Sequence, residues 1–309
     1  MFFWILITIS IISLSIITYS YHDIESFYHY AKGVNYIKNG FYEGASQELG
    51  FTISKQPKND KAYYQKGLAY YYMERYLPAI KNFEKAIDLK SDESKYYISR
   101  ANSYARIFKY QKAMSDFDSA IKIKPTEALN YHNRGLALLE QNNHEDALKD
   151  FNKAIELEPE NPLNYYSRAV TQLESGNYEY AIYDFDYVEQ KDPSYVNTYI
   201  NRGLAYYDTG EINNAYKDFD RATRLDNKNH YCYYLRGVVY LEYENYYKAM
   251  EDFNRALTLE PNHMESYLRR GDCYYVYQDN DNAIEDWKVA KSLGSDEAKE
   301  NLEKYFGLV

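Results

Sequence analysis

Residues 128–161 read ALNYHNRGLALLEQNNHEDALKDFNKAIELEPEN, and this stretch contains two helical patterns joined by a polar turn. In the first half, apolar or small residues recur at helical spacing around Gly135, and the run 141–143 then interrupts them. The second half repeats the spacing at Ala147, Phe151 and Ala154. Pro159 ends it, because the residue before a proline is driven out of the α region. The stretch therefore predicts two antiparallel helices of about thirteen residues each.

The same unit occurs eight times at a constant period of 34 residues. Each unit has a small residue in its first half, an alanine twelve residues later and, in seven units, a large ring four residues after that. The small residues are Gly33, Gly67, Ala101, Gly135, Ala169, Gly203, Gly237 and Gly271, and the rings are Phe83, Phe117, Phe151, Phe185, Phe219, Phe253 and Trp287, with Leu49 in the first unit. Self-similarity at this period is the signature of a solenoid, in which each hairpin packs only on its neighbours.

The unit resembles the tetratricopeptide repeat. Its order of aromatic, small, alanine, phenylalanine, alanine and proline residues is matched by Tyr131, Gly135, Ala147, Phe151, Ala154 and Pro159, whereas Leu138 replaces the family's tyrosine. The resemblance implies an all-α, right-handed superhelical solenoid of eight helix-turn-helix repeats. The units are 26–59, 60–93, 94–127, 128–161, 162–195, 196–229, 230–263 and 264–297.

The two ends of the repeat array depart from the pattern, as capping units do. The first unit has His29, Leu49 and Thr52 where the family prefers an aromatic, a ring and alanine, and Ser295 replaces the proline of the eighth. Residues 296–309 are expected to close the array as a helix capped by Ser295, and we assign 298–309 to a C-terminal capping helix.

Residues 1–21, MFFWILITISIISLSIITYSY, carry no ionisable side chain. Their length matches the ~20 helical residues that span a bilayer, and aromatic residues stand at both ends. We expect an N-terminal hydrophobic helix that acts as a transmembrane anchor. A cleavable signal peptide is the alternative, with Thr18 and Ser20 small enough for the cleavage site, and a buried soluble helix is a third interpretation. Asp23 and Glu25 after the segment favour repeats outside the cytoplasm.

A cation directly precedes every small residue, and an acid directly precedes the packing residue in seven units. This periodicity suggests ion pairs between stacked hairpins, for example Asp116 with Arg134; a solvated face is the alternative. The cations are Lys32, Lys66, Arg100, Arg134, Arg168, Arg202, Arg236 and Arg270, and the acids are Glu48, Asp116, Asp150, Asp184, Asp218, Asp252 and Asp286, with Asn82 in the second unit.

The resemblance also implies that the first helices of successive hairpins line a concave surface. Mapping by register gives a candidate peptide-binding groove at Tyr30, Tyr64, Leu68, Tyr71, Asn102, His132, Leu136, Tyr166, Val170, Ile200, Leu204, Tyr207, Tyr234, Val238, Leu268 and Tyr275. Tyrosine suits such a surface because it offers apolar area and a hydroxyl group together. The family's clamp for a terminal carboxylate requires lysine and asparagine at fixed positions on three consecutive units, and no three units supply that set.

Composition excludes several classes of function. The net charge of −10 does not suit a phosphate backbone, so we expect no nucleic-acid partner. Cys232 and Cys273 are too few for a disulfide framework and are expected to be small core residues. The six histidines are scattered and no catalytic signature occurs, so we expect no enzyme activity, cofactor or metal site.

We therefore expect a non-catalytic scaffold or adaptor that binds a peptide or protein segment in its concave groove while residues 1–21 hold it at a membrane. A secreted or periplasmic binding protein, freed by cleavage of residues 1–20, is the alternative. A third interpretation is a non-catalytic subunit of a membrane enzyme or export complex.

Overall fold

The computed structural model describes residues 24–308, which form helices and turns without a strand. The predicted anchor or signal peptide at 1–21 lies outside the described residues. Among the described helices, none combines the length and the apolar character that a membrane span requires. The chain divides into two compact units, an amino-terminal unit that ends at Pro159 and a carboxyl-terminal unit that begins at Glu160.

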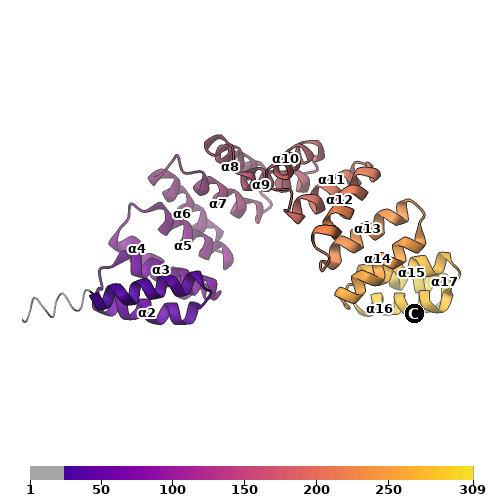
Figure 1. Cartoon of the computed structure of the whole chain (residues 1–309), viewed down its shortest axis with the longest axis horizontal. Coiled ribbons are helices and arrows are strands. Elements are labelled where there is room, and N and C mark those ends of the chain that lie inside the picture. Colours follow the sequence, from indigo (N-terminus) through magenta and orange to yellow (C-terminus); the bar gives the residue numbers. More distant parts are fainter. Residues whose placement is uncertain (1–23, 309) are drawn as a thin grey trace, which may run out of the picture. The chain divides into compact units, whose positions relative to one another are not determined.

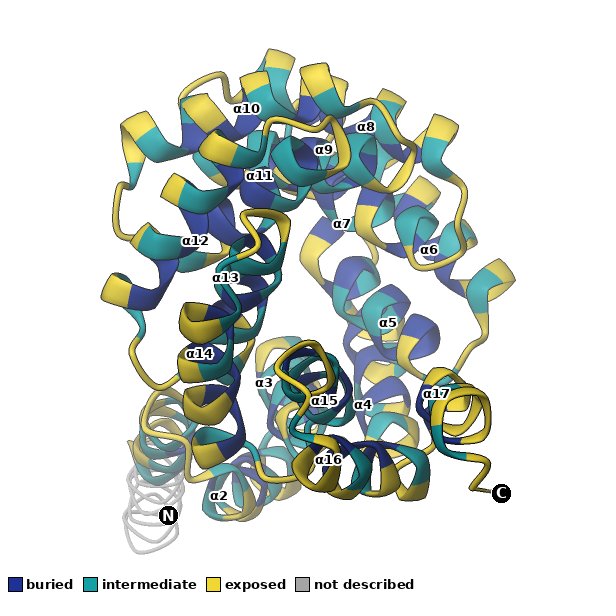
Figure 2. Cartoon of the chain, turned by 90° about the vertical axis from the view of Figure 1, so that its right-hand side faces the viewer, coloured by how far each residue is buried: buried dark blue, intermediate teal, exposed yellow. Residues whose placement is uncertain are grey.

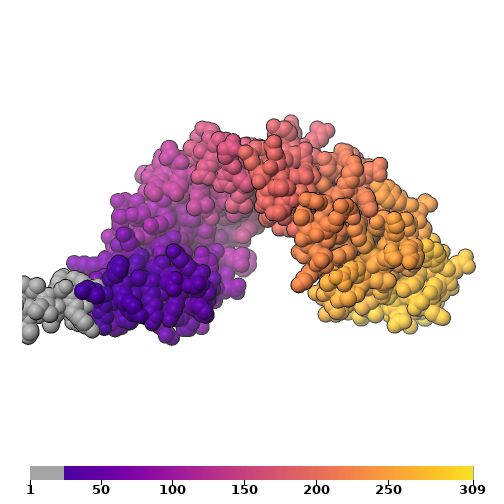
Figure 3. Space-filling model, in the orientation of Figure 1, coloured from indigo at the N-terminus to yellow at the C-terminus, as the bar shows by residue number. Residues whose placement is uncertain are grey.

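The amino-terminal unit is a stack of antiparallel helix pairs (Figure 1). Residues 24–38 form the first helix of the first pair. The helices that follow are α2 (Tyr42–Lys55), α3 (Asp60–Tyr72), α4 (Tyr76–Leu89), α5 (Ser94–Arg106), α6 (Tyr110–Ile123), α7 (Ala128–Leu139) and α8 (His144–Leu157). In the space-filling view the atoms of successive hairpins of this unit meet without a gap (Figure 3).

The carboxyl-terminal unit continues the same pattern of pairs and ends in a single helix (Figure 1). Its helices are α9 (Pro162–Glu174), α10 (Tyr178–Lys191), α11 (Val196–Asp208), α12 (Ile212–Leu225), α13 (His230–Glu242), α14 (Tyr246–Leu259), α15 (Met264–Val276), α16 (Asn280–Ser292) and α17 (Asp296–Phe306). From α3 to α15, the first helix of each pair begins 34 residues after the previous one. The helical hairpins are thus confirmed, whereas the right-handed path of the whole chain stays a prediction.

The turn inside each hairpin contains one residue in the left-handed backbone region. These residues also recur every 34 positions, at Gly40, Glu74, Phe108, Asn142, Gly176, Gly210, Glu244 and Gln278. Glycine adopts this conformation without strain, whereas a bulky side chain is unusual there. The turn geometry is therefore set by the repeat, and only some units have the residue that suits it best.

The core runs along the middle of each hairpin, where buried residues line the faces on which helices meet (Figure 2). The packing ring lies over the small residue of its own hairpin: a Cβ added to Gly135 would stand 2.8 Å from Cε1 of Phe151. The alanine of the second helix and the ring are both buried in every unit that has a ring. The small residues therefore make room for the ring, as well as allowing the helices to approach closely.

In all seven units that have an acid before the packing residue, this acid forms an ion pair with the periodic cation of the same hairpin. In six hairpins an arginine donates two hydrogen bonds to one buried aspartate at 2.7–2.8 Å, as Arg100 does to Asp116. Such bidentate, charge-assisted bonds are among the strongest polar contacts in proteins. Each pair joins the first helix of a hairpin to the second.

The specific pairing predicted for Asp116 with Arg134 is wrong. Arg134 pairs with Asp150 of its own hairpin and reaches the preceding hairpin through Asp118, at 2.7 Å. Arg202 and Arg236 make the same second contact, with Asp186 at 2.6 Å and Asp220 at 2.8 Å. The contact between hairpins therefore goes through an acid two residues after the predicted one, because the nearer carboxylate is already bound within the hairpin.

The carboxyl-terminal end of the array is covered by α17, as predicted, with Ser295 accepting a hydrogen bond from the backbone N–H of Ala298. Leu302 is buried, whereas Phe306 is half-buried beside Trp287 and Tyr305 is exposed.

Cys232 and Cys273 are buried thiols, and burial raises the pKa of each to about 12. The prediction that they are core residues is confirmed.

Candidate functional site

The first helices of successive hairpins place most of the predicted groove residues on the surface. Thirteen of the sixteen keep part of their side chain exposed: Tyr30, Tyr64, Leu68, Tyr71, Asn102, Leu136, Tyr166, Val170, Leu204, Tyr207, Tyr234, Val238 and Tyr275. His132, Ile200 and Leu268 are buried, so these three cannot contact a partner in this conformation, and the assignment of the other thirteen to a peptide groove stays a prediction. They occupy groove positions by register, but they pack into the core: Ile200 lies in a cluster with Phe219, Leu268 in one with Trp287 and Leu302, and the His132 ring lies 5.6 Å from that of Phe151.

A cavity of about 300 Å³ opens on the amino-terminal unit, and residues of α3, α5 and the start of α7 line it. It brings together four predicted groove residues, Tyr64, Leu68, Tyr71 and Asn102. Its size falls at the lower end of the ~300–1,000 Å³ typical of ligand pockets. Three successive first helices thus form one concave site in this unit.

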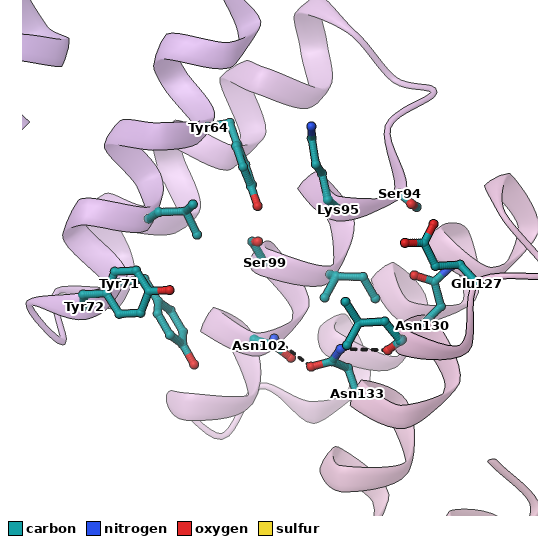
Figure 4. Close-up of a pocket in the computed structure, with 13 residues that line it drawn as sticks. Tyr64, Tyr71, Tyr72, Ser94, Lys95, Ser99, Asn102, Glu127, Asn130 and Asn133 are labelled. Carbon is teal, nitrogen blue, oxygen red and sulfur yellow. Dashed lines mark hydrogen bonds between the residues drawn. The ribbon is translucent and has the colours of Figure 1, made fainter. Parts of the chain in front are cut away.

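Polar groups from α5 and α7 form one side of the cavity (Figure 4). The Asn102 side chain donates to Oδ1 of Asn133 at 3.3 Å, and the Asn133 amide donates to the carbonyl of Leu129 at 2.7 Å. Each amide has further bonding capacity, since an asparagine side chain has two donors and an acceptor. This side of the cavity can therefore bind a backbone amide or a neutral polar side chain.

Tyrosines from α3 form another part of the wall. Figure 4 shows the hydroxyl of Tyr64 directed toward Ser99, with Tyr71 and Tyr72 lying together away from α7. Burial raises the pKa of Tyr64 and of Tyr71, so both hydroxyls stay protonated at neutral pH. Lys95 lies 5.6 Å from the ring centroid of Tyr64 and leaves its charge exposed. The cavity thus combines apolar area with neutral donors and with one side chain of each charge, Lys95 and Glu127.

Sequence reasoning did not include several residues of this cavity: Tyr72, Ser94, Ser99, Glu127, Leu129, Asn130 and Asn133. The last four belong to the start of α7 or the turn before it, in the next hairpin. Mapping one helix face at a time omits the part that the following hairpin supplies. The available signal was that Asn102 and Asn133 are both amides and are separated by almost one repeat.

The first-helix surface of the carboxyl-terminal unit is hydrogen-bonded among its own residues. The Asn201 amide donates to the Tyr166 hydroxyl at 2.9 Å, and the Tyr207 hydroxyl donates to Glu242 at 2.7 Å. Burial, assisted by Glu242, raises the pKa of Tyr207 to about 12. A partner binding here must replace these contacts.

The described residues contain no group of three histidine, cysteine or acidic side chains arranged to hold a metal.

Comparison with family models shows the protein family to which the chain belongs. Models described as tetratricopeptide repeat match residues 60–93, 94–127, 128–161, 151–183 and 230–263, and one described as TPR repeat matches 203–244. Together they span 60–183 and 203–263, more than half of the 309 residues. The chain therefore belongs to the tetratricopeptide repeat family. None of the curated proteins compared with it matches.

Solved structures share the fold. A tetratricopeptide repeat protein from Parabacteroides merdae ATCC 43184 has a TM-score of 0.61 at 20% identity, over 80% of this chain and 97% of that one. Yeast Tom70 has a TM-score of 0.58 at 20% identity, over 86% of this chain and 57% of that one. YrrB, described as a TPR protein with an unusual peptide-binding site, has a TM-score of 0.50 at 22% identity, over 60% and 95%. At these identities the likeness concerns the fold alone.

Proposed function

We propose that the protein is a non-catalytic scaffold that binds a segment of a partner protein on its first-helix surface, with the cavity between α3, α5 and α7 as the main anchor point. The observation that carries this proposal is the cavity itself, which is lined by predicted groove residues from successive hairpins. A partially apolar recess with a few neutral donors suits one side chain of an extended segment and the backbone beside it. YrrB, a protein of the same fold, is described as binding a peptide.

Site-specific crosslinking tests this proposal. A photo-reactive residue replacing Tyr71 should capture a partner in intact cells, and one replacing Glu156, exposed on the second helix α8, should not. Equivalent replacements of Tyr166 and Tyr207 test the carboxyl-terminal unit. Leu68→Glu, which adds a charge to the cavity wall, should abolish capture at Tyr71 while leaving the helical content unchanged. Capture from Glu156 but not from Tyr71, Tyr166 or Tyr207 would refute the groove.

The proposal includes a membrane location, which rests on residues 1–21 alone. Their lack of ionisable groups and their length support an anchor. After cell fractionation, mass spectrometry should find the intact amino terminus in the membrane pellet, resistant to washing with salt and alkali. A soluble species that begins near residue 21 would instead show a cleaved signal peptide and a freely diffusing binding protein.

A further inference from the structure

The turn between α5 and α6 exposes an aromatic ring that the repeat does not require. Phe108 is 79% exposed, more than any other large apolar side chain among the described residues, and its φ of 58° is in the left-handed region. No other unit has an aromatic residue at this turn position. A bulky residue in this conformation is a local structural cost. Its only described ring contact is with Tyr110, at 6.2 Å.

Cations flank Phe108 in the sequence. The turn sequence from Arg106 to Lys112 is RIFKYQK, with three cations and no acid. Lys109 and Lys112 are exposed, and neither forms an ion pair within the described residues. Arg106 donates to the Tyr76 hydroxyl of the preceding turn at 3.3 Å. We call Arg106, Phe108, Lys109 and Lys112 the cationic tip.

The same edge of the hairpins is acidic in the carboxyl-terminal unit. The turns between α13 and α14 and between α15 and α16, with the helix ends beside them, carry Glu242, Glu244, Asp279 and Asp281, and expose Tyr243 and Tyr277. The two turns are neighbours, since the rings of Tyr246 and Tyr277 lie 6.2 Å apart. Neither Glu244 nor Asp281 has an ion-pair partner among the described residues. We call these four acids and two tyrosines the acidic edge.

We propose that the cationic tip of one copy docks on the acidic edge of a second copy, with Phe108 packing against the exposed tyrosines. The two surfaces are complementary in charge, and each combines that charge with exposed aromatic area. Interfaces are enriched in aromatic residues and arginine, and their binding energy concentrates in a few such anchors. Charge complementarity sets the register and speeds the encounter.

A membrane is a less suitable partner for the tip, because of where the chain enters the unit. The first helix starts at residue 24 and reaches its turn about 22 Å away, at ~1.5 Å per residue. The turns of the first three hairpins are adjacent, through the stacked rings of Tyr42 and Tyr72 at 5.1 Å and the bond from Arg106 to Tyr76. The described chain therefore begins at the edge of the unit opposite the tip. A bilayer that held residues 1–21 would face that opposite edge.

Charge-swapped variants of the full chain test the proposal by sedimentation velocity in detergent micelles. At low ionic strength the unmodified chain should associate in a concentration-dependent way, and about 1 M salt should reverse this because the Debye length falls to about 3 Å. Lys109→Glu/Lys112→Glu and Glu244→Lys/Asp281→Lys should each fail to associate alone. A mixture of the two variants should associate again, because each retains one native surface. Phe108→Ala should weaken association at least about tenfold, as for an aromatic anchor.

Lys58→Glu/Lys61→Glu is the matched control, since it makes the same change of charge at the opposite edge of the same unit. It should leave association unchanged. Any association through residues 1–21 should be the same in the unmodified chain and in all the charge variants. A chain that stays monomeric at every concentration overturns the proposal, and so does association that ignores the charge swaps. Binding to vesicles of anionic phospholipid that depends on Lys109 and Lys112, without self-association, also overturns it and assigns the tip to a membrane.

Discussion

At the scale of single residues, each hairpin depends on the contact between a packing ring and the small residue beneath it. In the sixth unit a Cβ on Gly203 would stand 2.5 Å from Cε1 of Phe219, which is closer than real Cβ contacts come. The third and fifth units have Ala101 and Ala169 at this position, with buried rings opposite. The helix pair of those units must therefore be spaced to admit a methyl group, which the sequence period alone does not reveal.

Gly203→Ala should destabilise the protein by about 1–3 kcal/mol, the usual effect of overpacking a core. The substitution compares two opposing effects: the clash of the new methyl group with Phe219, and the helix propensity of alanine, which exceeds that of glycine by about 1 kcal/mol. Urea unfolding followed by circular dichroism measures the difference. The matched Ala169→Gly, which creates no clash, should cost about 0.5–1 kcal/mol from backbone entropy. Stabilisation by Gly203→Ala would show that the hairpin relaxes without strain.

The second unit is the one unit among the described residues without a cation–acid pair, because Asn82 stands at the acid position and Lys66 at the cation position. Burial lowers the pKa of Lys66, and its only described partner is the ring of Tyr70. Asn82→Asp should raise that pKa, form the missing pair and stabilise the protein by up to about 1 kcal/mol. Chemical denaturation at low salt measures the gain, with Ser115→Asp as a control of equal charge at an exposed site of α6. Equal effects of the two variants would contradict a specific pair.

At the scale of helices, the first helix of a hairpin often begins with a side chain that accepts a backbone hydrogen bond. Asn59, Asn161 and Asn229 cap α3, α9 and α13 in this way, and His263 takes the same role at α15, accepting from the Ser266 N–H at 3.3 Å. Burial lowers the pKa of His263, and its ring lies 4.9 Å from those of His230 and Tyr234. Glu265 approaches its other nitrogen at 3.5 Å.

Acid should therefore weaken the start of α15. The folded pKa of His263 lies below the unfolded value of about 6.5, so the stability it contributes is complete above that value and is lost as pH falls below it. Protonation also turns the capping nitrogen into a donor. His263→Asn keeps a cap and removes the titration, so the fall in melting temperature between pH 7.5 and pH 5.5 should be smaller in the variant than in the unmodified chain. The same pH dependence in both would exclude His263 as its source.

Helix content and pairing followed from the sequence because period, turn and proline all agree, as in residues 128–161. The sequence did not predict which side chains on different helices bind each other. Register places Asp116 near both Arg100 and Arg134, sixteen residues before it and eighteen after it, and only packing decides that Arg100 binds it. Register likewise places Ile200 and Leu268 on the groove face, but it does not show that a neighbouring helix buries them. Side-chain neighbours depend on distances that a repeat period does not contain.

At the scale of the whole molecule, the hairpins within each compact unit contact mainly the hairpins beside them, so the last hairpin of a unit has a neighbour on one side and needs a cover on the other. At the carboxyl-terminal end α17 supplies the missing neighbour. Its Phe306 and Tyr305 rings lie 6.0 Å from Trp287, the packing ring of the last hairpin, and Leu302 is buried with them. This short helix therefore protects the one core ring that would otherwise face solvent.

A chain that ends at Ser295 should lose order first in its last hairpin. Trp287 would be exposed on one side, and a solenoid opens from an end that lacks its cap. In a Trp4→Phe background Trp287 is the sole indole, so its emission should shift to longer wavelength in the shortened chain. Hydrogen exchange should accelerate across α15 and α16 while α9 and α10 keep their protection. The full-length Trp4→Phe chain is the control, and uniform loss of protection across both regions would show that the carboxyl-terminal unit unfolds as one cooperative body instead.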